Sequence, residues 1–153
     1  MNRDFVEMLS TLNAHNADYL IVGAHALAVH GHPRATGDID IWVRPTPENA
    51  AKVWRALARF GAPMRDLTVE DLSRPGVVFQ IGVPPCRVDI LTQIDGVTFD
   101  DAWPRRVETK IGELTTVAIG RADLIANKRA AGRPKDRADL AWLEAEGRGP
   151  ARG

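Results

Sequence analysis

The sequence predicts a single soluble domain of the mixed α/β (α+β) class, with helices flanking a mixed, twisted β-sheet. Apolar residues recur at helical spacing in some segments, alternate with polar residues in others, and the two kinds of segment interleave from end to end. The 153 residues are 44% hydrophobic and 26% charged, a size that suits one core rather than two. We therefore expect one domain over residues 1–146 and a short flexible tail over residues 147–153.

Helices and strands alternate in the first half of the chain. The first segment has an apolar residue every three or four positions and is preceded by Asn2, a good N-cap, so it predicts an amphipathic helix. Gly31 is placed to end a second helix in the left-handed conformation. The expected elements are a helix over 3–15, a strand over 19–22, a helix over 24–30, a strand over 38–43 and a helix from Thr46 through about Phe60.

The second half begins with an irregular connection over residues 63–76, which are rich in charges and turn formers. Turns are expected at Pro84-Pro85 and at Asp95-Gly96. The expected elements are strands over 77–82 and 87–91, a strand over 114–119 paired with residues 106–111, and a closing pair of helices over 121–131 and 135–145.

The charges exclude some classes of function. Twenty Lys and Arg residues balance twenty Asp and Glu residues, which argues against a protein that binds nucleic acid through bulk positive charge. Residues 1–120 carry 12 basic and 15 acidic side chains, and residues 121–153 carry 8 and 5, so an acidic body precedes basic C-terminal helices. The single Cys86 excludes an intramolecular disulfide, and no apolar run has the length of a signal peptide or membrane span. We expect a cytoplasmic protein without membrane contact.

The most informative segment is the acidic strand at residues 38–43. Asp38 and Asp40 share one face of this strand, and Ile39 and Ile41 lie on the other. A third carboxylate, Asp89, lies within a later apolar strand. Hard divalent cations prefer oxygen ligands, so three converging aspartates predict a two-metal site for phosphoryl chemistry. The alternative is an exposed edge strand whose solvent face is acidic, with Asp89 an ordinary strand residue.

Two further segments border this strand. Residues 19–24 predict a strand that enters a helix at the small-residue turn Gly23-Ala24, where free backbone N–H groups can hold a phosphate. Arg34 and Thr36 lie just before the aspartates. These two residues either contact phosphate or orient the loop.

Together these motifs resemble the nucleotidyltransferase fold of the DNA polymerase beta superfamily. The resemblance rests on Val22-Gly23-Ala24, on the run from Gly31 to Asp40 with its Arg-x-Thr-x-Asp-x-Asp pattern, and on the C-terminal run from Leu124 through Leu140. It covers about residues 18–143 and is closest to small single-domain bacterial members, including abortive-infection and toxin–antitoxin types.

Helical spacing places Lys128 and Asp136 on apolar faces of the last two helices. Lys128 follows Leu124 by four residues, and Asp136 precedes Leu140 by four. Buried charges are usually paired, so one interpretation is a Lys128–Asp136 salt bridge that joins the helices. The family pattern implies another, in which Lys128 faces a triphosphate or the acidic site.

The resemblance implies transfer of an NMP from an NTP such as ATP to a hydroxyl acceptor, with release of pyrophosphate. It implies that Asp38 and Asp40 bind Mg²⁺ or Mn²⁺, and that Asp89 completes the site and helps to deprotonate the acceptor. It implies that Lys128 is a fourth catalytic residue, with Lys128 or Arg34 neutralising the developing charge. Substrate contacts would come from the remaining motif residues, Gly23, Ala24, Arg34, Thr36 and Asp136. RNA 3′ ends, a protein Tyr, Ser or Thr, and a small hydroxylated molecule are all open as acceptors.

One residue departs from the family pattern. Some members have a serine hydroxyl where this chain has Ala24, which leaves only backbone N–H groups for phosphate. This departure supports a rival hypothesis, a nucleotide-binding or antitoxin-like partner protein with weak or no turnover. A toxin or antitoxin partner is accordingly a further expectation.

Other reactive residues are assigned to packing or to the surface. His25 and His30 are five positions apart and do not share a helical face, so the histidines, including His32, are not expected to be metal ligands. Cys86 lacks an activating charge partner. The four tryptophans are expected to pack in or around the core.

Overall fold

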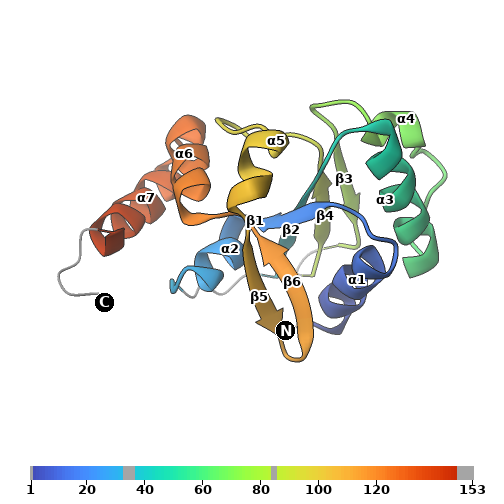
Figure 1. Ribbon diagram of the computed structural model, residues 1–153, viewed down its shortest axis with the longest axis horizontal. Helices are drawn as coiled ribbons and strands as arrows, with labels where there is room; N and C mark the ends of the chain where they lie inside the picture. Colours follow the sequence, from blue (N-terminus) through green and yellow to red (C-terminus); the bar gives the residue numbers. More distant parts are fainter. Residues whose placement is uncertain (1, 33–36, 84–85, 148–153) are drawn as a thin grey trace.

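The computed structural model describes residues 2–32, 37–83 and 86–147 (Figure 1). Six strands form one mixed sheet in the order β3-β4-β2-β1-β6-β5. The strands are β1 (Tyr19–Val22), β2 (Ile39–Val43), β3 (Val78–Ile81), β4 (Val88–Leu91), β5 (Val107–Ile111) and β6 (Leu114–Ala118). The β2 strand runs antiparallel to β1 and parallel to β4, and β6 runs parallel to β1. The predicted mixed sheet is confirmed.

Helices cover both faces of this sheet. They are α1 (Arg3–Ala14), α2 (Gly23–Val29), α3 (Pro47–Phe60), α4 (Val69–Leu72), α5 (Phe99–Ala102), a 3₁₀ turn η1 (Trp103–Arg105), α6 (Arg121–Ala131) and α7 (Pro134–Gly147). In Figure 1, α1, α3 and α4 lie on one side of the sheet, and α2, α6 and α7 lie on the other. The expected closing helical pair is therefore present as α6 and α7.

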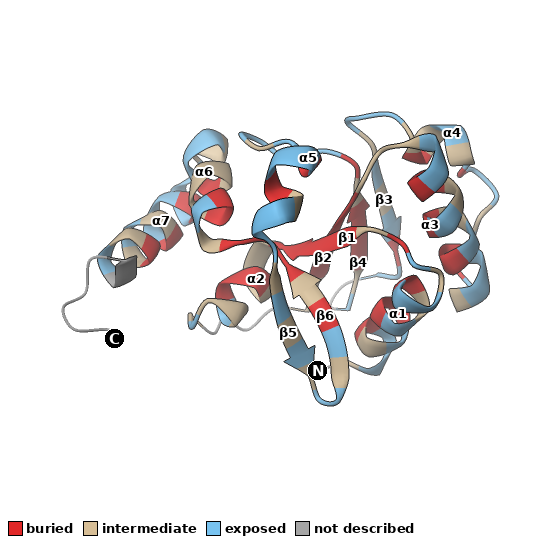
Figure 2. Ribbon diagram, in the orientation of Figure 1, coloured by how far each residue is buried: buried red, intermediate tan, exposed pale blue. Residues whose placement is uncertain are grey.

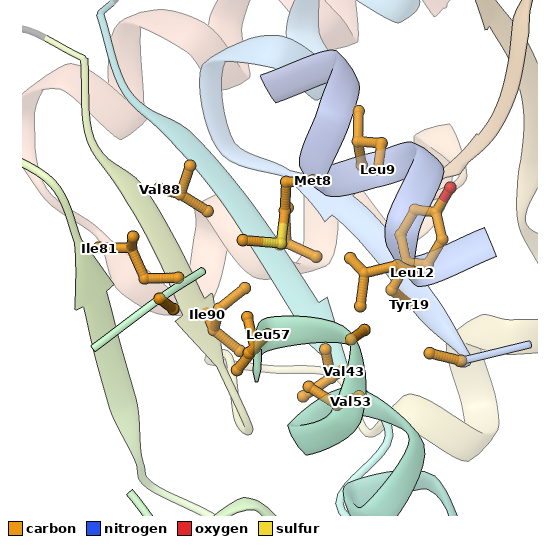
Figure 3. Packing of buried hydrophobic residues seen from close by; sticks show 14 of the residues in the cluster. Met8, Leu9, Leu12, Tyr19, Val43, Val53, Leu57, Ile81, Val88 and Ile90 are labelled. Carbon is orange, nitrogen blue, oxygen red and sulfur yellow. The ribbon is translucent and has the colours of Figure 1, made fainter. Parts of the chain in front are cut away.

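The alternation of side chains along β2 divides the core into two layers. Ile39, Ile41 and Val43 belong to the larger apolar cluster, which packs against α1 and α3. Figure 3 shows this layer, where Met8 and Leu57 approach the strands from the two helices. The central strands are buried along most of their length (Figure 2). Burial of these side chains removes apolar area from water and stabilises the sheet between its helices.

The opposite face of β2 is apolar at one end and acidic at the other. Trp42 packs with Leu20 and Phe99 in the second apolar cluster, beneath α2 and α5. Asp40 lies two residues before Trp42 and so projects from the same face. The acidic end of this face is where the candidate site is found.

Local capping explains where several helices begin and end. The Asn2 side chain accepts a hydrogen bond from the backbone N–H of Asp4 at 2.7 Å, as expected for the N-cap of α1. Thr46 caps α3 in the same way. Gly31 follows α2 with φ of +95°, and Gly132 ends α6 with φ of +63°, so both adopt the left-handed conformation expected at a helix end.

The structure differs from the prediction in three places. The connection over residues 63–76 contains the short helix α4, which begins with a reciprocal Thr68–Asp71 capping box. Residues 99–105 form α5 and η1, for which no element was predicted. Helix α7 begins at Pro134 and includes Gly147, which was assigned to the tail; residues 148–153 and the Pro84-Pro85 turn lie outside the described residues. In the described part of the chain, no helix combines the length and apolarity needed to cross a bilayer.

Candidate active site

The three predicted aspartates come together on one face of the sheet. Asp40 on β2 and Asp89 on β4 are direct neighbours in the register of two parallel strands, and Asp38 immediately precedes β2. All three line a cleft of about 660 Å³. Gly23 and Ala24 border the same cleft, and α6 contributes Asn127, Lys128 and Ala131 to its wall.

Asp40 lies in an electrostatic environment that disfavours its ionised form. Burial raises the pKa of Asp40 from 3.8 to about 6, and the Asp89 and Asp38 charges act in the same direction, with a smaller opposing effect from Lys135. The site therefore holds more negative charge than it can easily keep ionised. A bound cation would relieve this repulsion.

The raised pKa of Asp40 makes stability depend on pH. Between about pH 4 and 6 the folded protein retains a proton on Asp40 that the unfolded chain has released. The contribution of Asp40 to the free energy of unfolding is thus present below this window and lost as pH rises through it. Urea unfolding in a chelating buffer should show wild type losing stability relative to Asp40→Asn across these pH values. Parallel pH profiles for the two proteins would contradict the raised pKa.

Arg87 pairs with two of the three carboxylates, a role the sequence analysis missed. Its Nε and one Nη donate to the two Oδ atoms of Asp89 at 2.9 and 3.2 Å, and the same Nη lies 3.3 Å from Asp38. The backbone N–H of Arg87 also donates to Asp38 at 3.2 Å. These contacts raise the pKa of Arg87 further above its usual range, mainly through its hydrogen bonds to Asp89. The spacing of two residues between Arg87 and Asp89 on one strand face is the signal that identifies the pair.

The chemistry of the donors suits a hard divalent cation, because the site offers carboxylate oxygens and no sulfur. In the side-chain arrangement seen here, no three His, Cys, Asp or Glu residues of the described ranges are gathered as ligands of one ion. Arg87 directs Asp38 and Asp89 toward its own guanidinium. The residues therefore fit a divalent metal by type.

Gly23 lies directly against Asp40 at the start of α2. Its φ of +70° is in the left-handed region, and a Cβ at this position would lie 2.3 Å from Oδ2 of Asp40. No side chain of the described residues caps this end of α2, since Val22 occupies the N-cap position. The backbone here approaches the carboxylate closely because no Cβ intervenes.

Replacing Gly23 with Ala should reduce the catalytic activity of a reaction in this cleft at least about 100-fold, since a displacement of about 1 Å at a reacting centre has effects of this size. The added Cβ forces Asp40 away from its position. Gly112→Ala is the matched control, because its φ of +64° imposes similar backbone strain and its Cβ would meet no described atom within 4 Å. Equal activity losses in the two variants would refute a role for the close approach.

Lys128 forms the buried salt bridge predicted as one alternative. Its Nζ lies 3.3 Å from Asp136 and 3.1 Å from Asp139, and both carboxylates are fully buried. Arg133 adds a second cation, with its Nε 2.6 Å from Asp136. Burial alone would raise the pKa of Asp136, but hydrogen bonds from Arg133 and Lys128 lower it below its usual range. The network joins α6 to α7, and Lys128 at the same time lines the cleft.

Several polar residues of the cleft were not predicted. Asn127 donates to the backbone carbonyl of Asp95 at 2.9 Å, which fixes the turn against α6. Lys135 and Arg133 add positive charge, and Gln93 and Asp95 add further polar groups. These residues belong to segments that meet only through tertiary packing. The predicted residues Arg34 and Thr36 lie outside the described part of the chain.

Comparisons with known proteins identify the fold. No protein-family model matches the sequence, and no curated protein sequence matches it. A solved structure of the candidate nucleotidyltransferase TM1012 from Thermotoga maritima matches with a TM-score of 0.63 and 14% identity, over 94% of this chain and 92% of that one. This chain has the nucleotidyltransferase fold. The lincosamide antibiotic adenylyltransferase LnuA, solved with lincomycin bound, matches with a TM-score of 0.60 and 13% identity, over 95% and 97% of the two chains.

Within this nucleotidyltransferase fold none of the described histidines lines the cleft, although His25 is hydrogen-bonded to the backbone of Asp38 beside it. His30 Nε2 lies 2.8 Å from the carbonyl oxygen of Ile119, and His32 stacks on Trp142 with ring centroids 4.2 Å apart. His25 Nε2 is buried without a hydrogen-bond partner among the described residues, and burial lowers the pKa of this side chain. Trp42 is a core residue, as expected.

Proposed function

We propose that this protein is a cytoplasmic, metal-dependent nucleotidyltransferase that transfers an NMP from an NTP to a hydroxyl acceptor. The observation that carries the proposal is the pair Asp40 and Asp89, held in register on parallel strands beside Asp38 in one cleft. Basic side chains of the α6–α7 region line the same cleft. A cleft lined by both acidic and basic side chains suits a cation together with a polyphosphate.

The described residues can take separate roles in this reaction. Asp38, Asp40 and Asp89 would hold Mg²⁺ or Mn²⁺, which when bound supplies positive charge to the reacting phosphate. The acceptor hydroxyl oxygen forms a bond to the α-phosphorus, the bond to the bridging oxygen of the β-phosphate breaks, and pyrophosphate leaves. Asp89 would accept the hydroxyl proton, and the backbone N–H groups of Gly23 and Ala24 would contact the nucleotide phosphates.

Basic side chains that line the cleft would neutralise the charge that develops on pyrophosphate. Lys135 and Lys128 line the cleft, and Lys135 lies close enough to influence the pKa of Asp40. Lys128 is already paired with Asp136 and Asp139, so its positive charge is partly compensated. Arg34 and Thr36 stay as predictions of substrate contact. Asp136 was also predicted to contact substrate, but its carboxylate is fully buried against Lys128 and Arg133 and does not line the cleft.

The neutral net charge narrows the acceptor classes. A long nucleic acid would need excess positive charge for binding, which the chain as a whole lacks. The similar fold of LnuA, an adenylyltransferase that acts on lincosamide antibiotics, supports a small hydroxylated molecule. A protein hydroxyl and an RNA 3′ end are the other acceptors to be tested.

Ala24 supports a second candidate function. Its side chain lines the cleft but offers no hydroxyl to a phosphate. A protein that binds NTP without turnover, and acts as the antitoxin-like partner of a toxin, would keep the aspartates for nucleotide binding alone.

Thermal melting with Mg²⁺ and each NTP tests the shared metal–nucleotide step. We expect a rise in melting temperature that requires both components and is absent in Asp40→Asn. A second assay incubates the protein with α-labelled NTP, Mg²⁺ and fractionated cell extract. Label transferred to a small molecule, protein or RNA identifies the acceptor, whereas nucleotide-dependent stabilisation without transfer favours the binding protein. No metal-dependent shift in melting would refute both candidates.

A further inference from the structure

We propose that Arg87 is the internal counter-ion of the carboxylate site, and that it competes with the divalent cation for Asp38 and Asp89. On this proposal Arg87 leaves these carboxylates when the cation binds, and its guanidinium turns into the cleft. The inference rests on the proposed function, since it concerns the metal site of that reaction. It assigns Arg87 as a positioning residue.

The Arg87 guanidinium contacts two carboxylates of the proposed metal site. The guanidinium uses both carboxylate oxygens of Asp89 and also reaches Asp38, at distances of 2.9 to 3.3 Å. The Asp89 side chain is only 11% exposed, so its negative charge needs a partner within the protein. Arg87 is therefore the cation that compensates Asp89 in this structure.

The carboxylate oxygens that contact Arg87 are also the ones available to a divalent cation. A divalent cation bound by the three aspartates would take the same oxygens of Asp89 that the guanidinium now holds. In the arrangement that includes the Arg87 contacts, the three carboxylates do not form a group able to hold one metal ion, within the ranges that the structure describes. The arginine-bound and cation-bound arrangements are thus alternatives for the same side chains.

The surroundings of Arg87 show where its charge can go. Arg87 lines the cleft of about 660 Å³ together with Lys135 and the backbone turn at Gly23. A free guanidinium offers a planar set of donors that suits phosphate oxygens. A released Arg87 would therefore add positive charge to the cleft where the proposed nucleotide binds.

A purely structural role for Arg87 leads to the opposite expectation. If Arg87 only holds β4 and the start of β2 in place, its removal disorders Asp38 and Asp89 and weakens cation binding. If Arg87 competes with the cation, its removal strengthens cation binding. The sign of the change in affinity therefore separates the two roles.

The test is a titration with Mn²⁺ alone, in which the EPR signal of the free ion measures binding. The titration is carried out at about pH 8, where Asp40 is ionised. We expect Arg87→Ala to bind Mn²⁺ at least about tenfold more tightly than wild type, since hydrogen bonds between charged groups are strong enough for this change. Lys135→Ala also removes one positive charge from the cleft, but Lys135 makes no bidentate contact with Asp89. This variant should change Mn²⁺ affinity less than about threefold. Arg87→Lys keeps the positive charge but not the bidentate geometry, so its Mn²⁺ affinity should lie between those of wild type and Arg87→Ala. This variant replaces Arg87→Ala in the test if Arg87→Ala does not fold.

Arginine Nε–H NMR signals in wild type provide the second readout. The Arg87 signal, assigned by its loss in Arg87→Lys, should shift when diamagnetic Mg²⁺ is added. Unchanged or weaker Mn²⁺ binding in Arg87→Ala, or an Arg87 signal that does not respond to Mg²⁺, would overturn the inference. If the Arg87 inference is overturned but Asp40→Asn loses the Mn²⁺ binding of wild type, the proposed metal site is still supported. Absence of Mn²⁺ binding in every protein would reject both proposals.

Discussion

Replacing Asp40 with Asn should reduce nucleotidyl transfer at least about 1,000-fold, because the reaction depends on positioning and electrostatic stabilisation at one centre. The same change should leave the free energy of unfolding at neutral pH unchanged or higher. Burial and the Asp89 charge disfavour the ionised form of Asp40, and Asn is neutral. Steady-state transfer assays and urea unfolding measure the two effects. Lost activity with retained stability is the signature of a residue kept for function.

Asp123→Asn is the matched control for this prediction. Asp123 is a buried aspartate, whereas Asp40 is half-buried; Arg105 satisfies Asp123 with hydrogen bonds of 2.8 and 3.0 Å, and Asp123 does not line the proposed catalytic cleft. We expect Asp123→Asn to lose stability and to keep its activity per folded molecule. A similar loss of transfer in both variants would show that the effect of Asp40→Asn is not local.

Replacing Lys128 with Met should lower the free energy of unfolding by about 3–5 kcal/mol, the usual effect of removing one partner from a buried ion pair. The change removes the Lys128 ammonium from two fully buried carboxylates, Asp136 and Asp139, while Arg133 still pairs with Asp136. Urea unfolding monitored by circular dichroism measures this loss.

Arg129→Ala is the control on the same pair of helices. Arg129 pairs with Glu144 at 3.0 Å, but its side chain is 62% exposed, so we expect a loss below about 1 kcal/mol. A small effect of Lys128→Met would refute the structural importance of the buried network. Activity of Lys128→Met, assayed at a temperature where it remains folded, then tests the separate prediction that Lys128 faces a triphosphate.

The acidic strand was predictable because its pattern is local. Alternation fixes which face Asp38 and Asp40 share, and the apolar neighbours of Asp89 place it in a strand in the same way. Asp40 and Asp89 are neighbours because of the register between β2 and β4. The local sequence pattern does not specify this register. The convergence of all three was predicted from their places on strands and from the resemblance, and the tertiary structure places them in one cleft.

The residues that were missed depend on packing between distant segments. Asp139 lies one helical turn after Asp136 and pairs with Lys128 only because α6 and α7 pack together. Short helices were missed for a related reason. Helix α5 has four residues, too few for a helical period, and burial of Phe99 and Ala102 against the sheet stabilises it. Helix α4 had a local signal in its capping box, Thr68 followed by Asp71.

The central claim is that this cleft transfers a nucleoside monophosphate to a hydroxyl. The most direct measurement compares α-labelled with γ-labelled NTP in parallel reactions containing Mg²⁺ and an acceptor fraction. We expect the α label on the acceptor and the γ label in pyrophosphate, and neither product with Asp40→Asn. Appearance of the γ label on the acceptor, or no transfer from the α position under any acceptor fraction, would contradict the account.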